Sequence, residues 1–196
     1  MGARAAMALS KLSGDEQRIL FTQLCNVLEP RLAVYLSSTS HGLGEPTLAL
    51  LQQLKADHEA AAALCRKMGM RGCKELREAK SVNWYNTGLT VADLELLGTL
   101  GSVLPALESL VLFERLRPVP NGVQRLAEKL GAGALPVVTY LALDGMPLSD
   151  AGALALAAAL GRGALPRLKR LVLNNAGIGD AGLVSLAPAL RRLPAL

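Results

Sequence analysis

The last thirty residues of the chain change their hydrophobic period partway along. Leu171 and Leu173 alternate as in a short strand with one buried face. A stretch of turn-forming Asn and Gly residues follows. Leucines then recur at spacings of three or four, which places them on one side of a predicted helix: Leu183, Leu186, Leu190 and Leu193. One strand and one helix cannot bury these side chains alone, so the pattern predicts neighbours of the same kind.

The same pattern occurs earlier in the chain. Leu110 precedes Leu141 by 31 residues, and Leu141 precedes Leu171 by 30. Leu-Pro steps recur alongside, with gaps of 31, 30 and 28, at Pro105, Pro136, Pro166 and Pro194. In a more divergent first copy, Val82 and Trp84 take the leucine positions, in a strand expected at Ser81–Tyr85. Four copies at a nearly fixed period are typical of an α/β solenoid of stacked strand–helix layers.

The region before the copies has helical periodicity. Ser13 and Glu16 form a capping-box pair at a helix start. A long helix is expected from Pro46 until Gly69 stops it, with a further helical turn at 75–79. We therefore expect a loose N-terminus at 1–12, a helical region at 13–75, and about four repeats at 76–196, open at the C-terminal end.

The motif L-x-x-L-x-L, followed by a turn and a G-x-x-x-L helix start, resembles leucine-rich repeats of the ribonuclease-inhibitor-like kind. The resemblance covers residues 76–196 and is strongest at 168–196. It implies a horseshoe with parallel strands on the concave side and helices outside. The family usually has Asn or Cys at the ninth motif position, where this chain has Thr87, Met146 and Ala176.

The helical region resembles a degenerate F-box in the segments Leu12–Glu16, Ile19–Leu24, Leu28–Leu32 and Leu36–Ser40. This resemblance implies binding of a Skp-type adaptor of cullin ubiquitin ligases. The alternative is an N-terminal helical cap that shields the apolar side of the first repeat.

Composition and charge indicate the kind of core, the kinds of partner and the cellular compartment to expect. Hydrophobic residues make up 51% of the chain and aromatic residues only 3%, so the core is expected to be aliphatic. No apolar run reaches 18 residues, and we expect no membrane span. The net charge of +5 is dispersed, and the basic residues between Arg66 and Lys80 lack interleaved aromatics, so we expect no nucleic-acid partner. Three cysteines at no metal-like spacing favour a reducing compartment; we expect the cytoplasm, and a nuclear or organellar location also fits.

Catalytic chemistry finds no support in the sequence. His41 and His58 lack the motifs of nucleophilic catalysis, and no Gly-rich loop carries a phosphate-binding Lys. Asp150 and Asp180 lie at matching positions before two predicted helices, where an Asp side chain caps free N–H groups. We expect no catalytic, cofactor or metal site.

A candidate binding strip follows from strand alternation. Side chains flanking the core leucines point to the opposite face of the sheet, which assigns the concave surface. Three of the six aromatic residues fall there, and Tyr and Arg are frequent binding anchors. The expected partner-binding residues are Asn83, Tyr85, Val111, Phe113, Tyr140, Asp144, Arg170 and Asn174.

Three functions fit these patterns. The first is a non-catalytic module that binds a protein partner through the concave repeat surface. The second is an F-box-like substrate adaptor of a cullin ubiquitin ligase. The third is a fixed structural subunit of a larger assembly. The open C-terminal side of the repeats, where Pro194–Leu196 would start a fifth strand, also suggests self-association.

Overall fold

In the computed structural model of the chain, the described residues are 13, 16, 19, 26–31, 34 and 45–193. The chain divides into two compact units, Met1–Cys65 (unit 1) and Arg66–Leu196 (unit 2). The predicted loose segment 1–12, the start of a fifth strand at 194–196, and most of the F-box-like segments lie outside the described residues.

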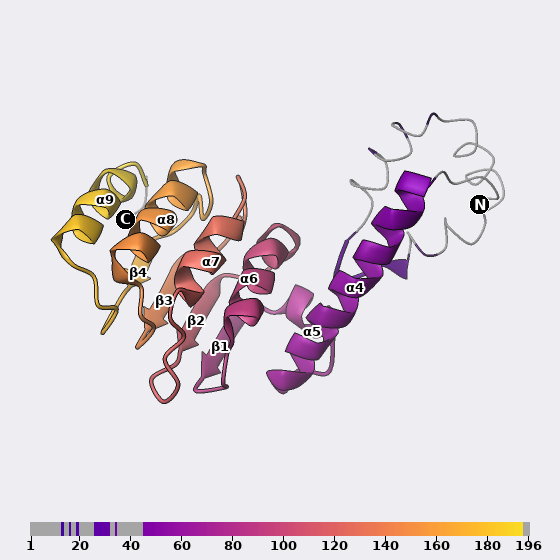
Figure 1. Cartoon of the computed structure of the whole chain (residues 1–196), viewed down its shortest axis with the longest axis horizontal. Coiled ribbons are helices and arrows are strands. Elements are labelled where there is room, and N and C mark those ends of the chain that lie inside the picture. The colour runs from indigo at the N-terminus through magenta and orange to yellow at the C-terminus, as the bar shows by residue number, and fades with distance from the viewer. Residues whose placement is uncertain are drawn as a thin grey trace. The chain divides into compact units, whose positions relative to one another are not determined.

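Helix α4 (Glu45–Lys67) confirms the long helix expected from Pro46 (Figure 1). It ends just before Gly69, whose φ of 73° suits a residue without a side chain. The capping box upstream is also confirmed. The Ser13 N–H donates to the Glu16 carboxylate at 2.8 Å, and the Glu16 N–H donates to the Ser13 hydroxyl at 3.4 Å. The hydrogen bonds from Ser13 hold the pKa of Glu16 below its usual value.

Unit 2 alternates strands and helices in chain order, as Figure 1 shows. The first strand matches the bounds expected for it. The elements are α5 (Cys73–Glu78), β1 (Ser81–Tyr85), α6 (Val91–Leu100), a 3₁₀ turn (Gly101–Val103), β2 (Ser109–Phe113), α7 (Gly122–Lys129), β3 (Tyr140–Asp144), α8 (Ser149–Gly161), β4 (Arg170–Val172) and α9 (Asp180–Leu190).

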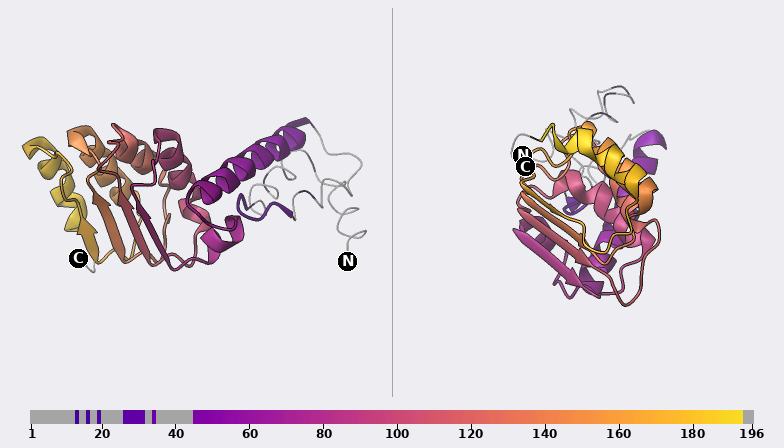
Figure 2. Two further views of the ribbon diagram at one scale, coloured as in Figure 1. Left: turned by 90° about the horizontal axis from the view of Figure 1, so that it is seen from below. Right: turned by 90° about the vertical axis from the view of Figure 1, so that its left-hand side faces the viewer.

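The strands form one parallel sheet in the order β1-β2-β3-β4, so the α/β class is confirmed. The register aligns Leu110 with Leu141, and Leu141 with Leu171, as the leucine spacing predicts. Helices α6 to α9 cover one face of the sheet, and no helix in the described part of unit 2 covers the other (Figure 2). This one-sided arrangement explains why alternate strand residues are buried, as the pattern of β1 shows.

The core between sheet and helices is aliphatic. Leu110 and Leu112 are fully buried, and Leu94 and Leu97 of α6 contribute from the helix side. Helices α6 and α7 approach closely at Gly98, where an added Cβ would lie 2.5 Å from the carbonyl oxygen of Leu126. Only glycine permits this separation.

Two polar side chains join the turn after β1 to the residues after β2. The buried Glu114 carboxylate accepts hydrogen bonds from the Leu89 N–H at 3.0 Å and from the Thr87 hydroxyl at 3.2 Å. In the opposite direction, the Asn86 side-chain oxygen accepts from the N–H groups of Arg115 and Leu116. These bonds satisfy turn groups that would otherwise be left without partners.

Two details differ from the sequence prediction. Asp150 does not cap its own helix: its Oδ1 accepts from the N–H groups of Gly179 and Gly182, at the start of α9. Asp180 is exposed and is itself the first residue of α9. Strand alternation places Ala142 on the same face of the sheet as Tyr140 and Asp144, yet Ala142 is only 3% exposed. Its small side chain lies between the larger Val111 and Val172 on the adjacent strands.

Candidate functional site

The sheet face opposite helices α6 to α9, here called the strand face, carries seven of the eight predicted binding residues. Asn83 pairs with Val111 across β1 and β2, and Phe113 lies between Tyr85 and Asp144. Tyr140 of β3 pairs with Arg170 of β4. Asn174 follows the end of β4 and is exposed, and its backbone oxygen accepts from the Gly145 N–H.

An aromatic pair marks one corner of the strand face. The rings of Tyr85 and Phe113 stack with centroids 3.9 Å apart and an interplanar angle of 8°. Tyr85 nevertheless keeps 60% of its surface exposed. Cross-strand packing therefore holds an accessible ring in one orientation, which reduces the entropy that a binding partner has to remove.

A second aromatic contact lies at the opposite ends of the strands. The Arg170 guanidinium is positioned over the Tyr140 ring, 5.5 Å from its centroid. This distance is within the range of a cation–π interaction. Since Tyr140 starts β3 and Tyr85 ends β1, the two aromatic sites are diagonal across the sheet.

Asp144 gives the strand face an unusual acceptor. Its Oδ1 atom is buried and, within the described part of the chain, has no hydrogen-bond partner. The residue pairs with Phe113 on β2. A buried carboxylate oxygen without a partner carries a desolvation cost, so this position is not explained by the stability of the strand face alone.

A groove along the N-terminal ends of the strands was not predicted. Its volume is about 510 Å³, and it is lined by Lys80, Pro105, Ala106, Glu108, Val137, Thr139, Pro166, Arg167 and Lys169. Lys80 forms an ion pair with Glu108 at 3.7 Å. A polar residue directly precedes each strand, at Lys80, Glu108, Thr139 and Lys169, but the alternation that predicts the strand face does not extend to these positions.

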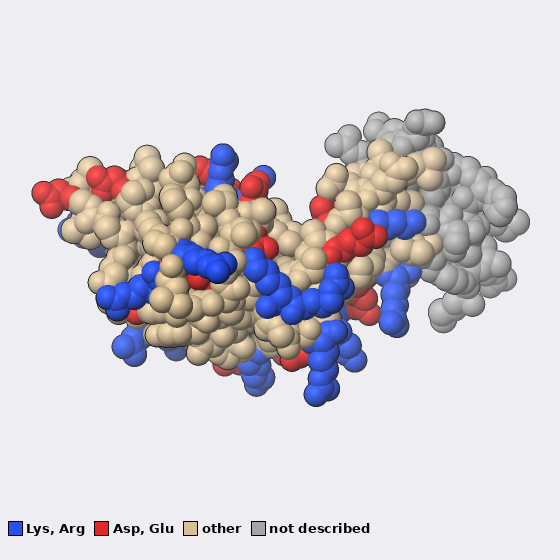
Figure 3. Space-filling view, turned by 60° about the horizontal axis from the view of Figure 1, so that its bottom comes forward, with Lys and Arg blue, Asp and Glu red and all other residues tan. Residues whose placement is uncertain are grey.

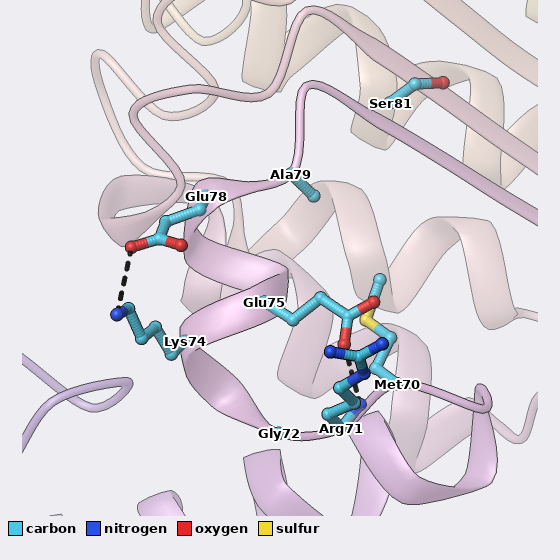
Figure 4. Close-up of a pocket in the computed structure, with 8 residues that line it drawn as sticks. All are labelled: Met70, Arg71, Gly72, Lys74, Glu75, Glu78, Ala79 and Ser81. Carbon is cyan, nitrogen blue, oxygen red and sulfur yellow. Dashed lines mark hydrogen bonds and ion pairs between the residues drawn. The ribbon is translucent and has the colours of Figure 1, made fainter.

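A second hollow, of about 730 Å³, lies around α5 (Figure 4). Two contacts join residues that line it: Lys74 pairs with Glu78 at 3.8 Å, and the backbone N–H of Arg71 donates to the Glu75 carboxylate at 2.8 Å. Over the view in Figure 3, Asp and Glu side chains lie among the Lys and Arg side chains of unit 2. Glu75 and Glu78 lie within the basic segment Arg66–Lys80 that the sequence singles out.

Within the described residues, no helix is long and apolar enough to cross a membrane. No three His, Cys, Asp or Glu side chains of that part of the chain lie close enough together to hold a metal ion. Neither a protein-family model nor a curated protein matches the chain.

Proposed function

We propose that unit 2 is a leucine-rich-repeat solenoid that binds a protein partner, without catalysis, through the strand face. The stacked strands support the solenoid, because Leu110, Leu141 and Leu171 occupy one row across three neighbouring strands. The placement of helices on one side of the sheet supports it as well, since it leaves the strand face free for a partner (Figure 2).

The observation that carries the binding proposal is the stacked pair formed by the exposed Tyr85 and the half-buried Phe113. Aromatic side chains lose large areas of accessible surface in an interface, and few degrees of freedom have to be fixed. In the stack of Tyr85 and Phe113, the exposed Tyr85 ring offers accessible surface to a partner, and the orientation of both rings is already fixed before binding. Arg170 and Asp144 provide polar groups near the edge of the strand face, where directional contacts set specificity.

The test compares proteins captured by the full chain and by the double variant Tyr85→Ala/Phe113→Ala, followed by direct titration of each captured protein. Loss of the pair removes about 2 kcal/mol or more from an interface centred on it, which weakens binding roughly thirtyfold. Leu154→Ala is the matched control: Leu154 is 59% exposed on α8, away from the strand face. Equal affinities for the wild type and the double variant would contradict the proposal.

The F-box-like adaptor and the fixed structural subunit stay predictions. The residues that carry the F-box resemblance lie mostly outside the described part of the chain. Leu28 is among those described, and it is buried. Co-purification of a Skp-type adaptor that is lost in Leu28→Asp, in a variant that remains folded, would favour the adaptor function over the module.

A further inference from the structure

The side of unit 2 formed by β4 and α9 differs from every layer before it. Strand β4 is an edge strand of the sheet, and among the described elements α9 packs against α8. Figure 2 (right) looks onto this side. Its apolar residues form a surface, here called the end face, made of Leu171, Leu173, Ile178, Leu183, Ala187 and Leu190.

The equivalent residues thirty positions earlier, in the layer of β3 and α8, show how much exposure a neighbouring layer removes. Leu141 is 2% exposed and Ala153 fully buried, whereas Leu171 is half-buried and Leu183 is 57% exposed. The other four positions differ in the same direction: Leu143, Leu148, Ala157 and Leu160 are all buried, and Leu173, Ile178, Ala187 and Leu190 are all half-buried. The layer of β4 and α9 covers the layer of β3 and α8, whereas no described residue covers the same surface of the β4–α9 layer.

The polar groups around the end face are arranged for self-pairing. Asp180 begins α9, and Arg191 and Arg192 follow its last residue; all three are exposed. When two copies of α9 lie antiparallel, the acidic start of one helix meets the basic end of the other on both sides. The same arrangement brings opposite ends of the helix dipoles together.

The backbone of β4 also permits a two-fold symmetric, antiparallel contact. Since Arg170 N–H donates to Thr139 on the β3 side, the next residue, Leu171, directs its backbone groups to the free edge. A two-fold axis at Val172 would place Leu171 opposite Leu173 of a second copy. Arg170 would then lie opposite Asn174, so that no two arginines face each other.

We propose that the end face binds the end face of a second copy of this chain, with β4 and α9 each antiparallel to their counterparts. Two four-stranded sheets then join at their edges, and the half-buried leucines of both copies become covered. The contact is isologous, because the same residues contribute from both copies. It leaves both strand faces free, so this inference does not depend on the proposed function.

The test measures the mass of the full chain by light scattering and sedimentation across a dilution series. We expect a species of twice 20.6 kDa that dissociates on dilution. Leu183→Lys should raise the dissociation constant at least about a hundredfold, because the charge enters a symmetric interface twice. The matched control is Val184→Lys: Val184 is 73% exposed, but Leu154, thirty residues earlier, stays 59% exposed beside α9, so this position lies outside the end face.

A charge exchange tests the orientation. Asp180→Arg and Arg191→Asp should each weaken the dimer, and the double variant should recover it because the opposite charges again meet. Circular dichroism on each variant checks that the helices are retained. A wild-type chain that is monomeric at every concentration would overturn the inference. Equal weakening by Leu183→Lys and Val184→Lys, or no recovery in the double variant, would overturn the assigned surface or its orientation.

Discussion

Glu114 offers the sharpest test of how the layers are held together. It is 1% exposed, and its carboxylate accepts from the Leu89 N–H and the Thr87 hydroxyl, 25 and 27 residues upstream. Glu114→Ala removes both acceptors and leaves a small void. A buried donor left without a partner costs about 1–3 kcal/mol. Including the second, half-buried donor, we expect a loss of about 2–4 kcal/mol, a large fraction of a typical folding free energy.

The assay is urea unfolding followed by the fluorescence of Trp84. This residue is the single tryptophan of the chain, is 3% exposed, and lies on the strand just before the turn that Glu114 supports. With an m-value of about 2 kcal/mol/M, the expected loss lowers the midpoint by about 1–2 M urea.

Glu114→Gln separates the acceptor from the rest of the side chain. Its amide oxygen can still accept from the Leu89 N–H, so we expect it to lose less than half as much as the alanine variant. Thr87→Val should cost little when added to Glu114→Ala, because the hydroxyl then has no acceptor to lose. An alanine variant within 0.5 kcal/mol of the wild type, on the scale of ordinary surface substitutions at about ±0.5 kcal/mol, would refute the reasoning. Equal losses for alanine and glutamine would refute it too.

Two further predictions concern α6. Burial acts to raise the pKa of Asp93, but hydrogen bonds from Lys67 and Thr90 outweigh it and hold the pKa below its usual value. Because the folded-state pKa is the lower one, the stabilisation is present above the ordinary Asp pKa of about 3.9 and is lost as pH falls through the folded value. The stability difference between wild type and Asp93→Asn should therefore shrink in acid, and a difference that is constant with pH would count against these bonds. Gly98→Ala should destabilise the chain by about 1–3 kcal/mol in thermal unfolding, since its Cβ would meet the Leu126 carbonyl. Gly131→Ala, with nothing within 4 Å of its Cβ, should leave the midpoint nearly unchanged, and equal effects would show that the close approach is not limiting.

The periodic part of the fold was predictable because its determinants are local. Alternation around Val82 and Trp84 gave the bounds of β1, and the interval from Leu141 to Leu171 anticipated their register. A side chain that faces the core has to recur at the same place in each layer. The spacing of leucines therefore carries the strand pairing in the sequence itself.

The contacts between polar groups of different layers were not predictable in this way. Asp150 lies at the start of one helix and so resembles a cap for that helix, but its acceptor contacts the start of α9, about 30 residues later. Glu114 directly follows a strand and gives no local sign that its donors lie upstream. Periodicity identifies which residues are equivalent, whereas the direction of a carboxylate depends on the separation of neighbouring helices.

The strand face also has features that local alternation predicts and features that depend on neighbouring strands. Alternation placed Tyr85 and Phe113 on one face, and their aligned positions follow from the register. The stack itself, the position of Arg170 over Tyr140, and the burial of Ala142 depend on side-chain sizes in adjacent strands. The groove at the strand starts was missed because loop residues have no such alternation.

The order of the strands in the sheet, β1-β2-β3-β4, is also their order along the polypeptide. During synthesis, each emerging strand finds its partner already made, and it adds to a single growing edge. No later segment has to be inserted between two earlier strands. A nascent chain can thus complete its layers one after another, without opening hydrogen bonds that it has already formed.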